Sequence, residues 1–194
     1  MSSYITRFAP SPSGLLHVGN VRTALLNYLV SKKNNGKFIL RIDDTDKERS
    51  KDNFIDEINE DLNWLGLNSD EYYKQSERID LYDEAFELLK GKELIYPCFE
   101  SLDELDKKRK RLIARRMPPV YDRAALKLTN DEITSLLDSG KKPHWRFKLS
   151  NKKITFTDLI RGEVNVDLAA QSDPVLKRED GDYLYNLPSV VDDI

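Results

Sequence analysis

The stretch Arg7–Asn20, with the sequence RFAPSPSGLLHVGN, decides the fold of the N-terminal part of this chain. The residues around its start, 4–8, alternate in the manner of a short β-strand. The prolines and the glycine inside the stretch forbid both a continued strand and an immediate helix. Beyond them, apolar residues recur at helical spacing, which predicts a helix over 18–33 that stops at the following Asn-Asn-Gly.

A loop that ends on a helix N-terminus suits an anionic ligand, because unpaired N–H groups and partial positive charge meet there. His17 adds a hydrogen-bond donor, and Gly14 and Gly19 allow a ligand to approach the backbone closely. No Gly-Lys-Ser/Thr follows at the spacing of a Walker A motif, and the loop contains no lysine. A lysine that neutralises phosphate must therefore come from elsewhere.

The run 37–42 is apolar and bounded by Gly36 and Asp43, which predicts a buried parallel strand and hence a βαβ unit. The ligand site of such a unit lies at the carboxyl ends of its strands, where the His17 loop and the acidic cluster Asp43–Asp46 would meet. A second helix is predicted from the apolar positions Phe54, Ile58, Leu62 and Leu65. A third is predicted to be capped by Ser76 and to end near Gly91.

Later in the chain, capping boxes at 101–104 and 129–132 predict two more helices. The runs 144–149 and 154–157 alternate as half-exposed strands. Seven Lys and Arg residues lie between 107 and 116, the densest basic run of the sequence.

The composition is that of an ordinary water-soluble protein, with 34% charged residues and a net charge of -3. Without a global basic excess, any contact with RNA must use a local patch. The single cysteine, Cys98, excludes an internal disulfide and a Cys-rich zinc site. No apolar run approaches the length of a membrane span, so we expect a cytoplasmic protein without membrane contact. We also expect a monomer.

Three blocks of the sequence carry a resemblance to a known family. Residues 7–14 followed by His17-Val18-Gly19-Asn20 resemble the signature of the glutamyl-tRNA synthetases, which are class I aminoacyl-tRNA synthetases. A lone His-x-Gly would be weak, since nucleotidylyltransferases use such a motif too. Residues 40–46 resemble the family's second block and 183–193 a third, in the family's order, so the resemblance covers the whole chain.

The resemblance implies an α/β fold: the first half of a Rossmann-like nucleotide-binding domain with an inserted α+β domain that holds the tRNA acceptor stem. We expect the catalytic domain at 1–94 and 182–194 and the insertion at 95–181. The family's second half and its mobile lysine-bearing loop would lie beyond Ile194. We therefore expect poor activity from this chain alone, with an exposed strand edge near Val190 and Val191.

The implied reaction activates L-glutamate with ATP and Mg²⁺ and transfers it to tRNA(Glu), or to tRNA(Gln). The implied catalytic residues are His17 and Asn20, the latter in place of a second histidine. The implied ATP-binding residues are Pro12, Gly14, His17, Gly19 and Asn20. The implied glutamate-binding residues are Arg7, Ala9, Ser11, Asp43, Tyr185 and Ser189. The implied tRNA-binding residues are Asp46, Arg49, Lys107, Arg109, Arg111 and Arg115. Some relatives hold zinc in the insertion, but Cys98 stands alone here, so no zinc is expected.

Each functional interpretation has an alternative. Asp44 and Asp46 could brace a loop, and the basic run could be a solvated helix face. The chain could belong to the shorter paralogue that glutamylates a modified base of tRNA(Asp), although the usual zinc cysteines of that paralogue are missing. It could also be a non-catalytic tRNA-binding module that has kept a nucleotide fold.

Overall fold

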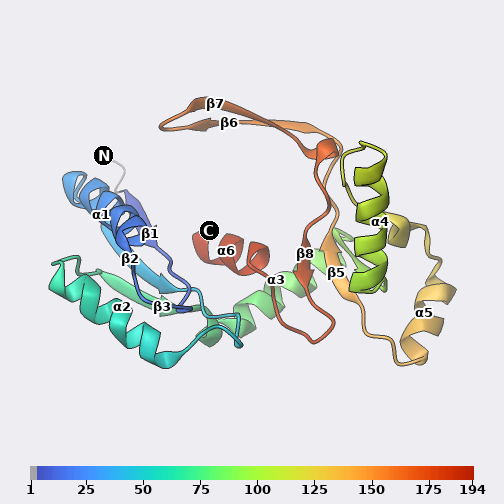
Figure 1. Ribbon diagram of the computed structural model, residues 1–194, viewed down its shortest axis with the longest axis horizontal. Coiled ribbons are helices and arrows are strands. Elements are labelled where there is room, and N and C mark those ends of the chain that lie inside the picture. Colours follow the sequence, from blue (N-terminus) through green and yellow to red (C-terminus); the bar gives the residue numbers. More distant parts are fainter. Residues whose placement is uncertain (1–3) are drawn as a thin grey trace. The chain divides into compact units, whose positions relative to one another are not determined.

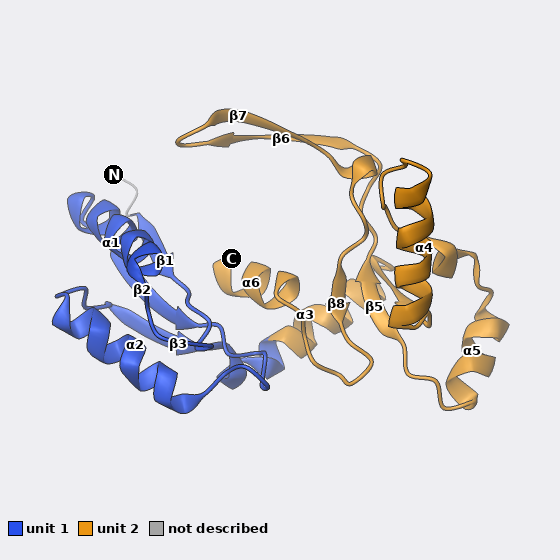
Figure 2. Ribbon diagram, in the orientation of Figure 1, with its two compact units in different colours: residues 1–81 blue, residues 82–194 orange. Residues whose placement is uncertain are grey.

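The computed structural model describes residues 4–194 and divides the chain into two compact units, residues 1–81 and 82–194 (Figure 2). Unit 1 contains β1 (Ile5–Phe8), α1 (Val18–Lys33), β2 (Lys37–Ile42), α2 (Asp52–Trp64), β3 (Glu71–Lys74) and the short 3-10 helix η1 (Gln75–Glu77) (Figure 1). β2 lies in the middle of a three-stranded sheet and pairs in parallel with both β1 and β3. The predicted βαβ unit is therefore confirmed, including the end of α1 at Lys33.

The core of unit 1 forms on the sheet face that alternate residues of β2 share. Phe38, Leu40 and Ile42 join Ala24 of α1 and Ile58 of α2 in one hydrophobic cluster. The predicted apolar face of α2 is shifted slightly. Its buried positions are Ile55, Ile58 and Leu62, whereas Leu65 caps the helix end and remains 38% exposed.

Unit 2 begins within α3 (Ile79–Gly91) and is built on a different kind of sheet. Its remaining elements are β4 (Ile95–Cys98), α4 (Leu102–Ala114), η2 (Ala124–Lys127), α5 (Asn130–Asp138), β5 (His144–Phe147), β6 (Lys153–Asp158), β7 (Gly162–Asp167), η3 (Leu168–Ala170), β8 (Val175–Lys177) and α6 (Asn186–Asp193) (Figure 1). β4, β5 and β8 form an antiparallel sheet, and β6 and β7 form a separate hairpin. Both predicted capping boxes are present, Ser101 with Glu104 on α4 and Thr129 with Glu132 on α5.

The core of unit 2 draws on segments far apart in the sequence. Tyr82 and Phe86 of α3 cluster with Ile95, Leu176 and Tyr183. Residues 182–194, assigned above to the catalytic domain, thus share a core with β4 and β8, which lie inside the predicted insertion 95–181. The domain boundaries themselves stay a prediction.

Two local predictions are wrong. Ser76 lies in η1 and not at the start of α3, and its hydroxyl donates to Asp44. The segment around Val190 is the helix α6 and not a strand edge; Pro188 is tolerated because it falls in the first turn, where backbone N–H groups lack helical partners. Within residues 4–194, no helix has both the length and the apolar character needed to cross a bilayer.

Candidate functional site

The loop between β1 and α1 is tied to the carboxyl end of β2. The backbone N–H of Asp43 donates to the carbonyl of Pro10 at 3.0 Å, and that of Lys51 donates to the carbonyl of Pro12 at 3.1 Å. The signature loop and the acidic cluster therefore meet, as the βαβ topology predicts. Pro12 itself is almost completely buried, so its side chain packs the loop.

His17 is the N-cap of α1. Its Nδ1 accepts a hydrogen bond from the backbone N–H of Gly19 at 3.1 Å, and its own N–H donates to Oδ1 of Asn20 at 3.4 Å. Because Nδ1 is an acceptor, a neutral His17 ring carries its proton on Nε2. The ring is exposed, so it can offer this N–H to a ligand.

The two glycines of the motif have different surroundings. A Cβ added at Gly19 would lie 2.8 Å from Cε1 and 3.0 Å from Nδ1 of His17, so the glycine makes room for the capping ring. A Cβ added at Gly14 would meet nothing within 4 Å. Open space at Gly14, beside a helix N-terminus, is compatible with a phosphate-bearing ligand.

Asp43 forms a buried ion pair that was not predicted from the sequence. Nε of Arg41 donates to Oδ1 of Asp43 at 2.6 Å, and Nη2 donates to Oδ2 at 3.1 Å. The side chains are only 3% and 8% exposed. The signal was available in the spacing, since residues two apart on a strand share one sheet face.

The other acids of the cluster brace the local structure. Asp44 accepts from the backbone N–H and the hydroxyl of Ser76, at 2.8 and 2.7 Å, and so holds η1. Asp46 accepts from Nε of Arg49 at 2.7 Å, and the hydrogen bonds from Arg49 lower the pKa of its carboxyl. For Asp44, the loop-bracing alternative is confirmed. For Asp46 and Arg49, a tRNA contact stays a prediction.

The six residues predicted to bind glutamate are distributed over both units. Arg7, Ala9 and Asp43 of unit 1 are half-buried or buried, and Ser11 is exposed. Tyr185 and Ser189 belong to unit 2, at the start of α6. Tyr185 is 63% exposed, whereas Ser189 is buried and its hydroxyl has no hydrogen-bond partner among residues 4–194.

The basic run forms much of α4, and its charges fall into two groups. Lys108 pairs with Glu100 and Asp122, both at 3.2 Å, and Lys110 pairs with Asp106 at 2.6 Å. In the described part of the chain no carboxylate forms an ion pair with the others, which are Lys107, Arg109, Arg111, Arg115 and Arg116. These five exposed cations are available to an external polyanion.

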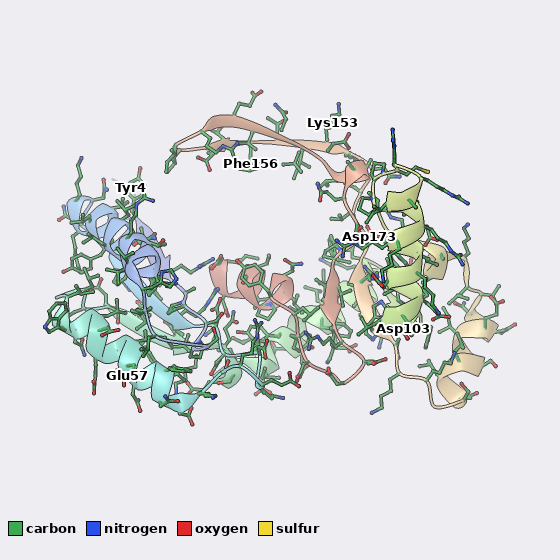
Figure 3. The ribbon with its side chains drawn as sticks, viewed as in Figure 1. Tyr4, Glu57, Asp103, Lys153, Phe156 and Asp173 are labelled. Atoms are coloured by element: carbon green, nitrogen blue, oxygen red, sulfur yellow. The ribbon has the colours of Figure 1, made fainter. Side chains whose placement is uncertain are left out.

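Buried polar groups surround the base of this helix. Burial raises the pKa of the Cys98 thiol to about 11 and lowers the pKa of His144 to about 4, so both are neutral at pH 7. Asp173, labelled in Figure 3, is completely buried and accepts from Tyr96 and Arg123, each at 2.7 Å. Among residues 4–194, no group of three or more His, Cys, Asp or Glu side chains could hold a metal ion.

Comparisons with known proteins agree with the geometry of the loop. The profile of the family described as "tRNA synthetases class I (E and Q), catalytic domain" matches residues 4–194. Glutamate--tRNA ligase 2 of Methylorubrum populi is 54% identical over 192 residues, which cover 99% of this chain and 43% of that protein. Glutamate--tRNA ligase 1 of Maricaulis maris is 56% identical over 188 residues, covering 97% of this chain and 42% of that protein.

The structural comparison gives the same result. The crystal structure of a glutamate tRNA ligase from Elizabethkingia meningosepticum, in complex with its amino acid, superimposes with a TM-score of 0.90 at 36% identity, covering 99% of this chain and 42% of that chain. This chain thus spans 42 to 43% of the length of these three relatives. The predicted α/β, Rossmann-like fold is confirmed, and the chain belongs to the class I tRNA synthetases of the glutamyl and glutaminyl group.

Proposed function

We propose that this chain is the N-terminal part of a glutamate--tRNA ligase, which forms glutamyl-adenylate from ATP and L-glutamate and transfers the glutamyl group to tRNA. The observation that carries the proposal is the cap of α1, where His17 Nδ1 accepts from Gly19 while the side chain remains exposed. The names of the relatives support a ligase over the paralogue that modifies tRNA(Asp).

The first reaction step depends on placement and on stabilisation of charge. The α-carboxylate of glutamate attacks the α-phosphorus of ATP in line, the bond to the bridging oxygen breaks, and pyrophosphate leaves with the electron pair. The N-terminal N–H groups of α1 and the Nε2–H of His17 stabilise the negative charge on the phosphate oxygens. Asn20 holds the His17 backbone through its Oδ1. Mg²⁺ would arrive bound to the phosphates of ATP and supply further positive charge.

Glutamate recognition is assigned to a guanidinium and a carboxylate. Arg7 lies on the sheet face opposite to the one on which Phe8 packs into the core. Its planar guanidinium suits the side-chain carboxylate of the substrate. Asp43 would meet the α-ammonium group. Because Arg41 holds both oxygens of Asp43, we propose that Arg41 fixes the direction of this carboxylate. Tyr185 and Ser189 complete the proposed substrate contacts.

tRNA binding is assigned to the unpaired cations of α4, namely Lys107, Arg109, Arg111 and Arg115, together with Asp46 and Arg49. The cationic side chains among these bind phosphates and confer affinity without reading the base sequence, whereas the Asp46 carboxylate holds Arg49. We propose tRNA(Glu) as the substrate, with tRNA(Gln) as the second candidate.

Glutamate-dependent exchange of radioactive pyrophosphate into ATP tests the proposal. The assay compares the 194-residue chain with a chimera in which this chain replaces the matching segment of the Maricaulis maris ligase. We expect robust exchange from the chimera, exchange that is about 10²–10³-fold slower after His17→Ala, and little exchange from the chain alone. A folded chimera that binds tRNA but does not exchange pyrophosphate would instead support the non-catalytic module.

A further inference from the structure

A cavity in unit 2 has no role in the proposed formation of glutamyl-adenylate, although three of its arginines, Arg109, Arg111 and Arg115, are also assigned above to tRNA binding. It has a volume of about 330 Å³ and lies between α4 and the segment 119–122, with Arg146 and Ser172 contributing to its lining. This volume is near the lower end of the range of small-molecule sites, roughly 300–1,000 Å³. All of its lining residues belong to unit 2, so the cavity is defined without reference to the His17 loop.

The lining is strongly cationic. Arg109 and Arg111 of α4 and Arg115 at its C-cap contribute to it, and none of them forms an ion pair within residues 4–194. Asp122 is the one carboxylate among the lining residues, and it is already paired with Lys108. The uncompensated charge of the cavity is therefore positive and favours an anion.

The remaining lining arginine, Arg146, is built into the protein. It is 8% exposed, an Nη donates to the carbonyl of Asp173 at 2.7 Å, and its guanidinium carbon lies 4.3 Å from the ring centroid of Tyr121. Its Nε has no hydrogen-bond partner in the described part of the chain. A buried donor without a partner is unfavourable, and an acceptor bound in the cavity would relieve this cost.

The wall beside these arginines is apolar. Leu105 and Leu112 come from α4, and Pro119 and Val120 come from the facing segment. A bare phosphate would leave this surface unused, whereas a ligand that joins a flat, weakly polar ring to a phosphate would cover both parts of the lining. Arginine also suits phosphate in particular, because its donors form paired hydrogen bonds with phosphate oxygens.

We propose that this cavity binds one nucleoside monophosphate unit, with the phosphate on Arg109, Arg115 and Arg146 and the base against the apolar wall. A free nucleotide and an unpaired nucleotide of an RNA share this chemistry. The site is separate from the proposed ATP site.

The test measures the fluorescence anisotropy of AMP that carries an N-methylanthraniloyl group, with the 194-residue chain in a His17→Ala background to remove the contribution of the signature loop. Arg109→Ala with Arg115→Ala should weaken binding about tenfold or more. The matched control, Lys110→Ala with Arg116→Ala, removes the same charge from the same region outside the cavity and should change binding less than about twofold. Arg109→Lys with Arg115→Lys, which keeps the charge, should restore part of the affinity.

Several results would overturn the proposal. Equal losses in the two alanine pairs would mean that general charge attracts the probe. No binding in the His17→Ala background would assign the nucleotide to unit 1. If inorganic phosphate displaces the probe as effectively as AMP does, the apolar wall has no role.

Displacement by a short RNA with an unpaired 3′ end would identify RNA as the natural source of the nucleotide, and failure of that RNA where AMP succeeds would identify a free nucleotide. Circular dichroism checks that each variant is folded.

Discussion

The helices α1 and α4 begin with the same kind of cap but differ in charge. His17 and Asn20 form the capping box of α1, and Ser101 and Glu104 form that of α4. The first turn of α1 contains no acidic residue, whereas the first turn of α4 contains Asp103 and Glu104. Carboxylates in the first turn compensate the positive end of the helix dipole. The end of α4 is therefore satisfied by the protein itself, while the end of α1 is left electropositive for a ligand.

α5 supports this interpretation. Its box, Thr129 with Glu132, places Asp131 and Glu132 in the first turn, as Asp103 and Glu104 are placed in α4. Two helices outside the signature loop are thus capped for stability alone. The uncharged cap of α1 is what the proposed contact with the ATP phosphates requires.

The largest effect should come from removing each cap in turn in the chimera. His17→Ala and Ser101→Ala should each cost roughly 1 kcal/mol of stability, because each removes a capping acceptor. Only His17→Ala also removes a donor to the phosphates, so it alone should lower pyrophosphate exchange, by about 10²–10³-fold. Thermal unfolding and the exchange assay measure the two quantities. Similar exchange losses in both variants would contradict the distinction between a ligand-binding cap and a stabilising cap.

A second experiment tests whether α4 binds anions through its cationic side chains. This would differ from α1, which is proposed to bind phosphate at its N-terminus. Replacing Lys107, Arg109, Arg111 and Arg115 with Gln should weaken tRNA binding on the order of tenfold at low salt. The slope of log affinity against log salt should become shallower by about 0.9 for each phosphate that the variant no longer neutralises. Lys108→Gln with Lys110→Gln, which removes two cations that carboxylates already pair, is the control. Filter binding at several salt concentrations gives the slope. An unchanged slope would mean that the basic run is a solvated helix face and does not contact tRNA phosphates.

Asn20→Asp would give α1 the kind of acidic first turn that α4 has. The new carboxylate can still accept from the N–H of His17, and it should stabilise the helix by about 0.3–1 kcal/mol. The same charge would repel phosphate, so exchange should fall by about fivefold for ~1 kcal/mol of repulsion. Stability and activity should thus move in opposite directions. A variant in which both rise would show that the terminus of α1 does not meet the phosphates.

The smallest effect is a pH dependence that the acidic cap of α4 should have and the uncharged cap of α1 should not. Hydrogen bonds from the backbone N–H and the hydroxyl of Ser101 lower the pKa of Glu104 below its ordinary value of 4.5. The stabilisation is therefore complete above the ordinary pKa and is lost as the pH falls through the lowered one. Acid titration of the helical circular dichroism signal should show a smaller loss in Glu104→Gln than in the wild-type chain, because Glu132 of α5, whose pKa Thr129 lowers in the same way, still titrates in both. Identical titrations of the two proteins would mean that the carboxylate does not stabilise the folded state.

Sequence periodicity predicted the parts of the fold that local rules determine. The helix over 18–33, the strand over 37–42 and both Ser/Thr capping boxes are where the spacing places them. β3 was missed because its four residues, Glu-Tyr-Tyr-Lys, show no apolar run and gain their strand form from pairing with β2. The segment of α6 resembles a strand in sequence because Val190 and Val191 are β-branched, although the packing of Val191 and Leu187 into the core of unit 2 favours the helix.

The candidate site was predictable where the motif is continuous in sequence. The meeting of the His17 loop with Asp43 follows from parallel topology. The pairing of Asp44 with Ser76 depends on β3 and η1, which the sequence did not reveal, and the spacing of Arg41 and Asp43 indicates a shared face without showing that the side chains pair. Which acids face a ligand and which brace the protein could therefore not be decided from residue type alone.

The close contact between Gly19 and His17 has an evolutionary consequence. With the capping ring in place, Gly19→Ala would force its Cβ to within 2.8 Å of the ring and should disrupt the cap. Once His17→Ser has removed the ring, the same Gly19→Ala exchanges glycine for the best helix former and should stabilise α1 by about 1 kcal/mol. The sign of the effect of one substitution thus depends on the other. A lineage that gives up His17 can then accumulate changes at position 19 that make a return to histidine unfavourable, so loss of the ligand-binding cap would tend to be irreversible.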